Sequence, residues 1–449
     1  MSALRRIASR AGVDSAIAWN LAPQVFAALA GPALVLLLTT QLSADDQGFY
    51  FAFTSLVGSA VLLELGLTTA LAQVVAHERA QLRTGPGGAL LDDGLHKGRL
   101  RALVAGAGRR YCATAGLLTL LLATAGTGFL ASGSPQVSGW VGPWLALSVL
   151  AGLALLAQLA YVLVEACGEV ARSARARALA AVSGTTATGA ALLAGGRLWS
   201  PAVGLAVSTI GGLALVLPRL RRTLADLRDA ADSPFSWRRE VWPFQWRVAV
   251  TTAAGYATAQ AFVPILFAAR GTRAAGRMGL SLLLVNAVVG LAMTWLVTRR
   301  AAFSTLAAHG QVAELDRVWG AAARRSLAVS TAGCTALLAL AAAAGAVGLP
   351  VAHRVLDLPA LSLLCLGMLL TQVQWAQSAY LRAYKEEALL KVRVWSSVLS
   401  VAAVAAAVPR FGELGQATAF AAVASVVSLG AGTRVFRRRR TYWRSLHAV

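Results

Sequence analysis

The sequence predicts an all-α polytopic membrane protein with about twelve transmembrane helices, arranged as two six-helix lobes with both termini in the cytoplasm. Three observations support this fold class: the apolar composition, the series of long apolar runs and the uneven placement of basic residues. Of the 449 residues, 57% are hydrophobic and 13% are charged, and the mean hydropathy is +0.64. This balance excludes a water-soluble globular protein.

Apolar runs bounded by arginine, or by Gly and Pro, define the predicted helices in chain order. Each crossing needs roughly 20 residues, so the helices use most of the chain and leave only short connectors. The run from Ala16 to Leu38 is too long for the core of a signal peptide and is expected to remain as the first helix. The predicted helices cover 15–39, 49–75, 112–131, 141–164, 178–195, 201–218, 248–269, 278–298, 326–348, 358–381, 394–408 and 415–433.

Lysine and arginine residues set the predicted orientation because they accumulate in cytoplasmic loops. With these helices, 35 of the 41 Lys and Arg residues fall in the two terminal segments and the loops on their side, and 6 fall in the opposite loops. Both termini are therefore predicted to be cytoplasmic. The formal charge of +22 follows from this topology, so no nucleic-acid partner is expected.

Connecting segments divide the chain into predicted domains. The two halves share a weak pattern, because Trp19 precedes a span that is followed by Gly48, and Trp246 precedes a span that is followed by Gly276. Two parallel lobes of this kind hold a substrate between them near the membrane midplane. The predicted domains are an N-terminal lobe (1–218), a cytoplasmic amphipathic connector (219–247), a C-terminal lobe (248–433) and a basic cytoplasmic tail (434–449).

Residues that carry catalysis or bind metals are sparse. The short external loops offer only the acids Asp45, Asp46, Asp357 and Glu413, so an enzyme working at the outer surface is not expected. No C-x-x-C, H-E-x-x-H or nucleotide-binding glycine-rich loop is present, and neither a metal nor a cofactor is expected. The cysteines and histidines are scattered, at Cys112, Cys167, Cys334, Cys365, His77, His96, His309, His353 and His447.

Glu64 is the most informative polar residue, because it lies near the middle of the second predicted helix. An ionised carboxylate there costs several kcal/mol unless it is protonated, paired or exposed to water. Thr68 lies one turn away on the same face. Two interpretations stay open: a cavity carboxylate that binds a proton, a cation or a substrate hydroxyl, and a structural acid paired between packed helices.

Other polar residues group on the first, seventh, eighth and tenth predicted helices. Hydrogen bonding between helices explains each one singly, whereas their grouping favours a polar cavity. The candidates are Asn20 and Gln24 on the first helix, Thr251, Gly255 and Thr258 on the seventh, Asn286 on the eighth, and Thr371, Gln374, Gln377 and Ser378 on the tenth.

Arginines at the two ends of the seventh predicted helix are candidate contacts for a pyrophosphate, which arginine binds through two parallel hydrogen bonds. Arg247 begins this helix and Arg270 ends it, with Arg273 and Arg277 close behind on the external side. An interfacial anchor among tryptophans is the alternative for Arg247. A separate segment, Glu314–Leu327, places apolar residues on one face and predicts a short amphipathic helix in the interface.

Four stretches of this sequence resemble the oligosaccharide flippase family of the multidrug, oligosaccharidyl-lipid and polysaccharide exporter superfamily. Residues 42–51 (LSADDQGFYF) resemble the family's first loop, which ends in Gly and aromatic residues. Residues 62–73 (LLELGLTTALAQ) resemble its second helix, which carries an acid, Leu-Gly-Leu and a late Gln. The segments 243–247 (PFQWR) and 313–317 (AELDR) are similar to those before the seventh and ninth helices of some members.

The resemblance implies two six-helix lobes around a central cavity and alternating access. It implies transport of a polyprenyl-pyrophosphate-linked oligosaccharide across a bacterial inner membrane for polysaccharide biosynthesis, with Glu64 suited to proton or sodium coupling. Membrane lipid and the lipid-linked saccharide are the expected partners, together with contacts to a polysaccharide polymerase or glycosyltransferases. A cation-coupled exporter of small amphipathic compounds on the same fold, and a non-transporting scaffold, stay open as alternatives.

Overall fold

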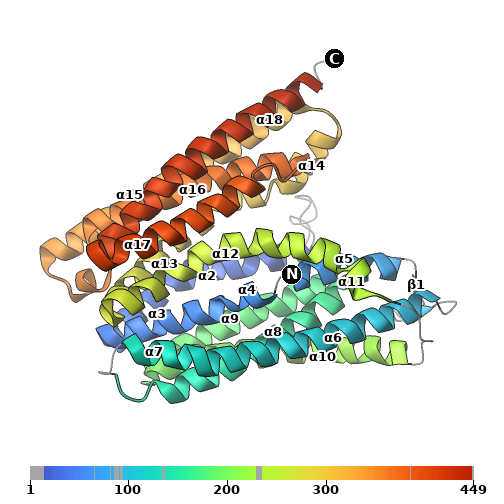
Figure 1. Cartoon of the computed structure of the whole chain (residues 1–449), viewed down its shortest axis with the longest axis horizontal. Coiled ribbons are helices and arrows are strands. Elements are labelled where there is room, and N and C mark those ends of the chain that lie inside the picture. The colour runs from blue at the N-terminus through green and yellow to red at the C-terminus, as the bar shows by residue number, and fades with distance from the viewer. Residues whose placement is uncertain are drawn as a thin grey trace, which may run out of the picture. The chain divides into compact units, whose positions relative to one another are not determined.

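The computed structural model describes residues 15–64, 66–80, 82–84, 90–91, 95–133, 137–228, 235–384 and 386–446. These residues are almost wholly helical (Figure 1), apart from one antiparallel pair of two-residue strands, β1 (Arg83–Thr84) and β2 (Leu90–Leu91). The predicted all-α fold is confirmed. Seven of the described helical segments are long and apolar enough to cross a membrane, and the chain is an integral multi-pass membrane protein.

Contacts divide the chain into two compact units. Unit 1 comprises Met1–Gln41, Leu56–Ala131 and Pro135–Ala253, and unit 2 comprises Leu42–Ser55, Ser132–Ser134 and Ala254–Val449. This division differs from the predicted domains, because a segment of the first half of the chain, 42–55, packs with unit 2. The predicted six-helix lobes therefore stay a prediction.

Unit 1 is built on four long helices that lie side by side in Figure 1: α6, α8, α9 and α10. Its core includes Tyr161, Val164 and Val216. The helices of this unit are α2 (Ser15–Gln41), α4 (Ala60–Glu64), α5 (Leu67–Ala80), α6 (Leu95–Leu121), the π-helix η2 (Leu122–Gly126), α7 (Thr127–Gly133), α8 (Val141–Ala166), α9 (Val170–Leu193), the 3-10 helix η3 (Arg197–Trp199), α10 (Ser200–Arg228) and α11 (Trp237–Glu240).

Unit 2 packs α16 against α15, α17 and α18. Three helices contain residues of both units: α3 (Ala44–Gly58), α7, whose last two residues belong to unit 2, and α12 (Trp242–Arg270). The other helices of unit 2 are α13 (Thr272–Val297), α14 (Arg300–Ala308), α15 (Val312–Val347), the 3-10 helix η4 (Pro350–Arg354), α16 (Leu358–Ala383), α17 (Leu390–Val423, kinked at Gly412), the π-helix η5 (Ala424–Ala431) and α18 (Gly432–Leu446).

The second predicted helix, 49–75, is broken into α3, α4 and α5. Gly66 has a φ of 66°, which lies in the left-handed region that favours glycine and ends a right-handed helix. The Glu64 carboxylate accepts a hydrogen bond from the backbone N–H of Thr68 at 2.9 Å. An acid therefore caps the first turn of α5 after the break, satisfying one of the N–H groups that a helix start leaves without a partner.

The third predicted helix is longer than its apolar run, because α6 begins at Leu95, within 77–111, the predicted loop between the second and third predicted helices. Leu100, Leu103, Ala107 and Tyr111 are all fully buried. Their spacing of three and four residues puts them on one face of α6. This apolar face is buried even though arginines occupy positions on other faces of the helix. An apolar stripe on a charged helix was missed by a search for continuous apolar runs.

The predicted short interfacial helix, Glu314–Leu327, is wrong as a separate element. The structure has one continuous helix, α15, of 36 residues, which spans about 54 Å at 1.5 Å per residue. Leu315 and Ala322 belong to the buried core of unit 2 instead of facing lipid. No proline interrupts α15, so the amphipathic segment continues into the membrane-spanning segment.

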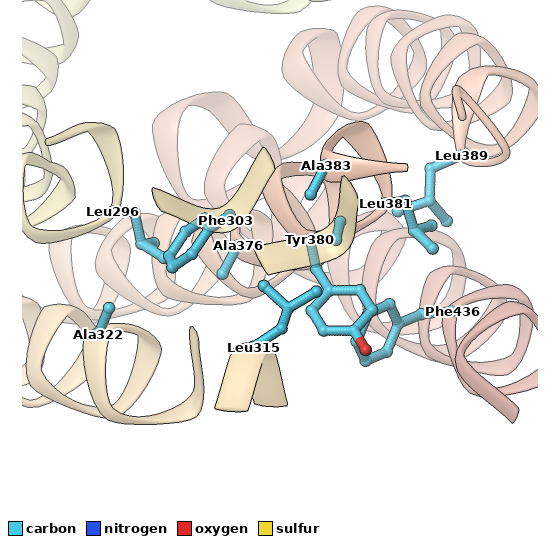
Figure 2. Close-up of a cluster of buried hydrophobic side chains, with 11 residues drawn as sticks. Leu296, Phe303, Leu315, Ala322, Ala376, Tyr380, Leu381, Ala383, Leu389 and Phe436 are labelled. Carbon is cyan, nitrogen blue, oxygen red and sulfur yellow. The ribbon is translucent and has the colours of Figure 1, made fainter. Parts of the chain in front are cut away.

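The core of unit 2 attaches the C-terminal helix α18. Figure 2 shows Leu315, Tyr380 and Phe436 close together in this core, and the rings of Tyr380 and Phe436 meet edge to face with centroids 5.4 Å apart. Asp316 on α15 binds Arg440 at 2.9 Å and also pairs with Arg444. Residues 434–446 of the predicted basic tail are thus helical and packed.

Two glycines allow α3 and α13 to cross closely within unit 2. A Cβ atom at Gly276 would lie 3.0 Å from the backbone nitrogen of Gly48, and one at Gly48 would clash with the Thr272 backbone. Small residues permit such approach between membrane helices. These are the two glycines of the weak sequence repeat, so the corresponding positions of the two halves lie against each other.

Candidate functional site

A polar cavity of about 130 Å³ lies inside unit 2. Hydroxyl and amide groups, aromatic rings and one arginine line it, and no carboxylate occurs among its described lining residues. The hydroxyl groups are those of Thr258, Thr371, Ser396, Ser397, Ser400 and Ser428; the amides are Asn286 and Gln374; the aromatic residues are Phe262, Trp375 and Phe420; and the cation is Arg393.

Helical spacing explains how these side chains reach one cavity. Arg393, Ser396, Ser397 and Ser400 lie at positions i, i+3, i+4 and i+7 of α17 and so share one face. The same spacing joins Thr258 to Phe262 on α12 and Thr371 to Gln374 and Trp375 on α16. Asn286 projects from α13 and Ser428 from η5.

Hydrogen bonds between hydroxyl groups connect the helices around the cavity. Thr258 Oγ1 lies 2.6 Å from Ser397 Oγ, and Ser396 Oγ lies 2.8 Å from Ser428 Oγ. Thr371 Oγ1 donates to the carbonyl of Gly367 at 2.8 Å. Each hydroxyl oxygen has two acceptor lone pairs and one proton, so these pairs retain capacity to bind a polar ligand.

The one cation in the cavity lining, Arg393, is half-buried, and none of the described residues forms an ion pair or side-chain hydrogen bond with it. The charge of Glu387 acts on Arg393, but that carboxylate is bound by Arg382 at 2.7 Å. A partly desolvated guanidinium without a hydrogen-bonded anion is costly. The cavity is therefore electrostatically prepared for a negatively charged group.

Unit 1 contains a second pocket, of about 390 Å³, which includes Glu64. Tyr111 Oη lies 3.4 Å from Glu64 Oε1 and 2.8 Å from Thr68 Oγ1. Arg110 places its guanidinium 4.1 Å from the ring centroid of Trp237, a cation–π contact. This pocket therefore combines an acid with aromatic and basic groups, and its carboxylate has protein partners.

The structure brings together some of the predicted site residues and not others. Asn286, Gln374, Thr258 and Thr371 line the unit 2 cavity, while Glu64 and Thr68 are neighbours in unit 1. Gln377 does not line the cavity and donates to Thr433 Oγ1 at 2.9 Å. Among the predicted candidates, the side chains outside the described residues are those of Asn20, Gln24, Arg247 and Thr251, together with Gly255.

The predicted external arginines have protein partners within unit 2. Arg270 donates to the carbonyls of Val408 (3.1 Å) and Pro409 (2.8 Å), next to the kink in α17. Arg273 is 74% exposed and lies 3.5 Å from Asp45. These contacts explain Arg270 and Arg273 by local pairing, and the pyrophosphate role of Arg247, Arg270 and Arg273 stays a prediction.

Sequence reasoning missed Arg393 and Tyr111. Arg393 was counted among the basic residues of a cytoplasmic loop, although its spacing to three serines predicts a shared helix face. Tyr111 stood at the end of the predicted loop 77–111, and the extension of α6 brings its hydroxyl to Glu64. Only the Arg393 pattern was readable from the sequence.

No family model matches the sequence, and no curated protein sequence matches it. Solved structures of transporters share its fold. A transporter of the MOP superfamily from Pyrococcus furiosus, described as having a binding pocket of reverse polarity, is 14% identical, with 96% of this chain and 97% of that chain covered and a TM-score of 0.58. An inward-facing multidrug resistance transporter of the MATE family is 15% identical, with 95% of each chain covered and a TM-score of 0.56.

The lipid II flippase MurJ, in an inward closed conformation, is also similar. It is 10% identical, with 96% of this chain and 91% of that chain covered and a TM-score of 0.59. At these identities the likeness establishes the fold. This chain therefore has the fold of the MOP superfamily transporters, and the two-lobe, twelve-helix arrangement predicted from the sequence fits that fold.

Proposed function

We propose that this protein is a membrane transporter that moves a lipid-linked oligosaccharide, joined to its lipid through pyrophosphate, across the bacterial inner membrane by alternating access. The lining of the unit 2 cavity carries the proposal. Hydroxyl and amide groups supply the hydrogen bonds that a saccharide requires, aromatic rings supply apolar faces, and Arg393 supplies a positive charge. The shared fold with both drug exporters and a lipid flippase supports transport as the general activity.

Glu64 is the residue we assign to ion coupling in this proposal. Its carboxylate borders a pocket, and its hydrogen-bond donors among the described residues are the Thr68 N–H and the Tyr111 hydroxyl. A carboxylate held at a helix break can gain or lose a proton or a sodium ion with a change in local structure. Proton or sodium coupling would then drive transport. Polysaccharide polymerase and glycosyltransferase contacts stay predictions.

A second candidate function is cation-coupled export of small amphipathic compounds. The unit 1 pocket favours it, because an organic cation is attracted by an acid and by aromatic faces, here Glu64, Trp237 and Trp242. Arg110 and Arg238 line the same pocket and oppose such a ligand. The unit 2 cavity opposes it as well, since Arg393 would repel a cation.

Transport by the purified protein in liposomes separates the two functions. The substrates compared are a fluorescent polyprenyl-pyrophosphate oligosaccharide and a lipophilic cationic dye, each with and without imposed proton and sodium gradients. We expect the lipid-linked saccharide to move and one gradient to accelerate it. Movement of the dye alone would establish the exporter. If correctly oriented protein moves neither the saccharide nor the dye, the result would favour the non-transporting scaffold.

A further inference from the structure

The C-terminal helix α18 carries six arginines and no acid within 15 residues. It begins at Gly432, where the twelfth predicted membrane helix, 415–433, ends. A cluster of about four to eight basic residues directly beyond a membrane helix is typical of segments that bind anionic lipid. The contacts of each arginine decide which of them are available to a lipid. The six are Arg434, Arg437, Arg438, Arg439, Arg440 and Arg444.

One side of α18 attaches the helix to the rest of unit 2. Phe436 is 4% exposed and belongs to the core of this unit. The Trp443 ring stacks on Tyr384 with centroids 4.5 Å apart, and its indole N–H donates to the Glu386 carboxylate at 2.9 Å. These contacts hold α18 in one orientation and therefore fix the direction in which its other side points.

Three of the six arginines pair with acids on the attached side. Arg439 lies 3.0 Å from Glu386. Asp316 on α15 accepts hydrogen bonds from Arg440 at 2.9 Å and from Arg444 at 2.8 Å. Two carboxylates from other helices and loops thus offset the charge on this side of α18.

The other three arginines, Arg434, Arg437 and Arg438, form what we call the arginine face. All three are exposed, and none of the acids that the structure describes forms an ion pair with them. Their spacing of i, i+3 and i+4 places them on one face of α18, where like charges repel each other. The protein therefore holds three guanidinium groups together without an anion from its own described residues.

Distance along the helices separates the arginine face from the paired arginines. At 1.5 Å per residue, the arginine face lies within about 8 Å of residue 433, the predicted membrane boundary. Asp316 lies about 15 Å of helix before residue 326, where the ninth predicted membrane helix begins. Its partners Arg440 and Arg444 lie about 10 to 17 Å beyond residue 433. The acids therefore pair with the arginines farther from the membrane, and those at the level of the lipid phosphates stay unpaired.

We infer that the arginine face binds the headgroups of anionic phospholipids in the adjacent leaflet, on the predicted cytoplasmic side of the membrane. A guanidinium binds two phosphate oxygens through parallel hydrogen bonds, and several arginines beside a leaflet attract its anionic lipids together. The alternative anion is an acidic protein surface. The position of the unpaired charges next to the predicted membrane boundary favours lipid. The inference goes beyond the proposed function and does not depend on which substrate is transported.

A photoreactive amino acid in place of Arg434 reports which lipid lies against the arginine face. The full-length protein is reconstituted into nanodiscs of equal parts phosphatidylglycerol and phosphatidylcholine and irradiated, and the lipid adducts at position 434 are counted by mass spectrometry. We expect phosphatidylglycerol adducts to exceed phosphatidylcholine adducts about fivefold or more while Arg437 and Arg438 are present. Raising the ionic strength should reduce this enrichment, because salt screens exposed charges.

Two paired variants show whether the arginine face causes the enrichment. Arg437→Gln with Arg438→Gln should bring the two kinds of adduct close to equal numbers. Arg437→Lys with Arg438→Lys keeps both charges and should retain most of the enrichment, and it keeps the inference testable if the glutamine variant does not fold. The control is Arg317→Gln, which removes an arginine that is 76% exposed and lies about 14 Å of helix before residue 326. It should leave the enrichment unchanged.

Three results would overturn the inference. Equal numbers of the two adducts with Arg437 and Arg438 in place would show that the arginine face does not select anionic lipid. Enrichment that persists in the glutamine variant would assign the effect to the overall positive charge of the protein. Folded protein that forms no lipid adduct at position 434 would place the arginine face away from the membrane and favour an acidic protein partner.

Discussion

The unit 1 pocket and the unit 2 cavity differ in whether their charged group is satisfied by the protein. Glu64 in unit 1 accepts hydrogen bonds from Thr68 and Tyr111, and caps a helix after a break. Arg393 in unit 2 has no such partner among the described residues, and the buried Gln374 amide beside the same cavity lacks an acceptor. A charge bound at its own helix break is suited to switching, and a charge without a hydrogen-bonded anion is suited to ligand binding.

Reversing the charge of the unit 2 cavity should give the largest effect. We expect Arg393→Glu to reduce transport of the lipid-linked oligosaccharide about 100-fold or more, because a carboxylate repels pyrophosphate where a guanidinium attracts it. The initial rate in proteoliposomes is the measurement. Lys391→Glu makes the same change in net charge at an exposed position and should transport normally. Equal losses in both variants would assign the effect to overall charge.

Neutralising Glu64 should remove the response to an ion gradient. Glu64→Gln keeps an oxygen that accepts from the Thr68 N–H and the Tyr111 hydroxyl, so the helix break should persist and the protein should reach the membrane at normal levels. Acceleration of transport by the gradient, compared at equal protein, should fall about tenfold or more. The exposed acid Glu314, changed to Gln, serves as the control. A gradient response that survives in Glu64→Gln would make this residue structural.

Adding an acid to the unit 2 cavity makes it resemble the unit 1 pocket. Asn286→Asp is nearly isosteric and places a carboxylate in the lining that holds Arg393. We expect the affinity for pyrophosphate to fall about tenfold, since the new charge offsets the guanidinium. Titration calorimetry measures the change. An unchanged affinity would place the bound anion outside this cavity.

Removing one hydroxyl from the Glu64 cluster should give the smallest effect. Tyr111→Phe deletes the hydrogen bonds to Glu64 and Thr68 and keeps the fully buried ring. The expected loss of stability is about 1 kcal/mol, seen as a lower thermal midpoint, with less than a threefold change in transport. A loss of transport as large as that of Glu64→Gln would instead make Tyr111 part of the coupling site.

Hydrophobic length was sufficient to predict where most of the helices lie, because membrane-spanning segments must be long, apolar and internally hydrogen-bonded. The same method failed where a helix carries charge on one face. Residues 95–111 and 314–327 were read as a loop and an interfacial helix, yet Leu100, Tyr111 and Leu315 are fully buried. Their burial depends on neighbouring helices, which a single segment of sequence does not reveal.

The candidate site was predictable in part. Asn286, Gln374 and the threonines were found because polar residues are rare in apolar runs, and four of them line one cavity. Arg393 was missed because arginines near helix ends are normally explained by topology. The break at Gly66 was missed because Leu-Gly-Leu reads as continuous helix, and the Glu64 cap depends on a side-chain contact. The close crossing of α3 and α13 at Gly48 and Gly276 was indicated in the sequence only by the weak repeat that contains both glycines.

Photo-crosslinking compares the two regions most directly and tests whether the saccharide headgroup occupies the unit 2 cavity. A photoreactive amino acid replaces Leu282, which lines that cavity, or Leu63, which lines the unit 1 pocket. Each protein is irradiated with an oligosaccharide-labelled polyprenyl pyrophosphate, without an ion gradient. We predict labelling at position 282 that excess inorganic pyrophosphate abolishes, and little at position 63. Labelling at position 63 with none at position 282 would contradict the assignment of the headgroup to unit 2.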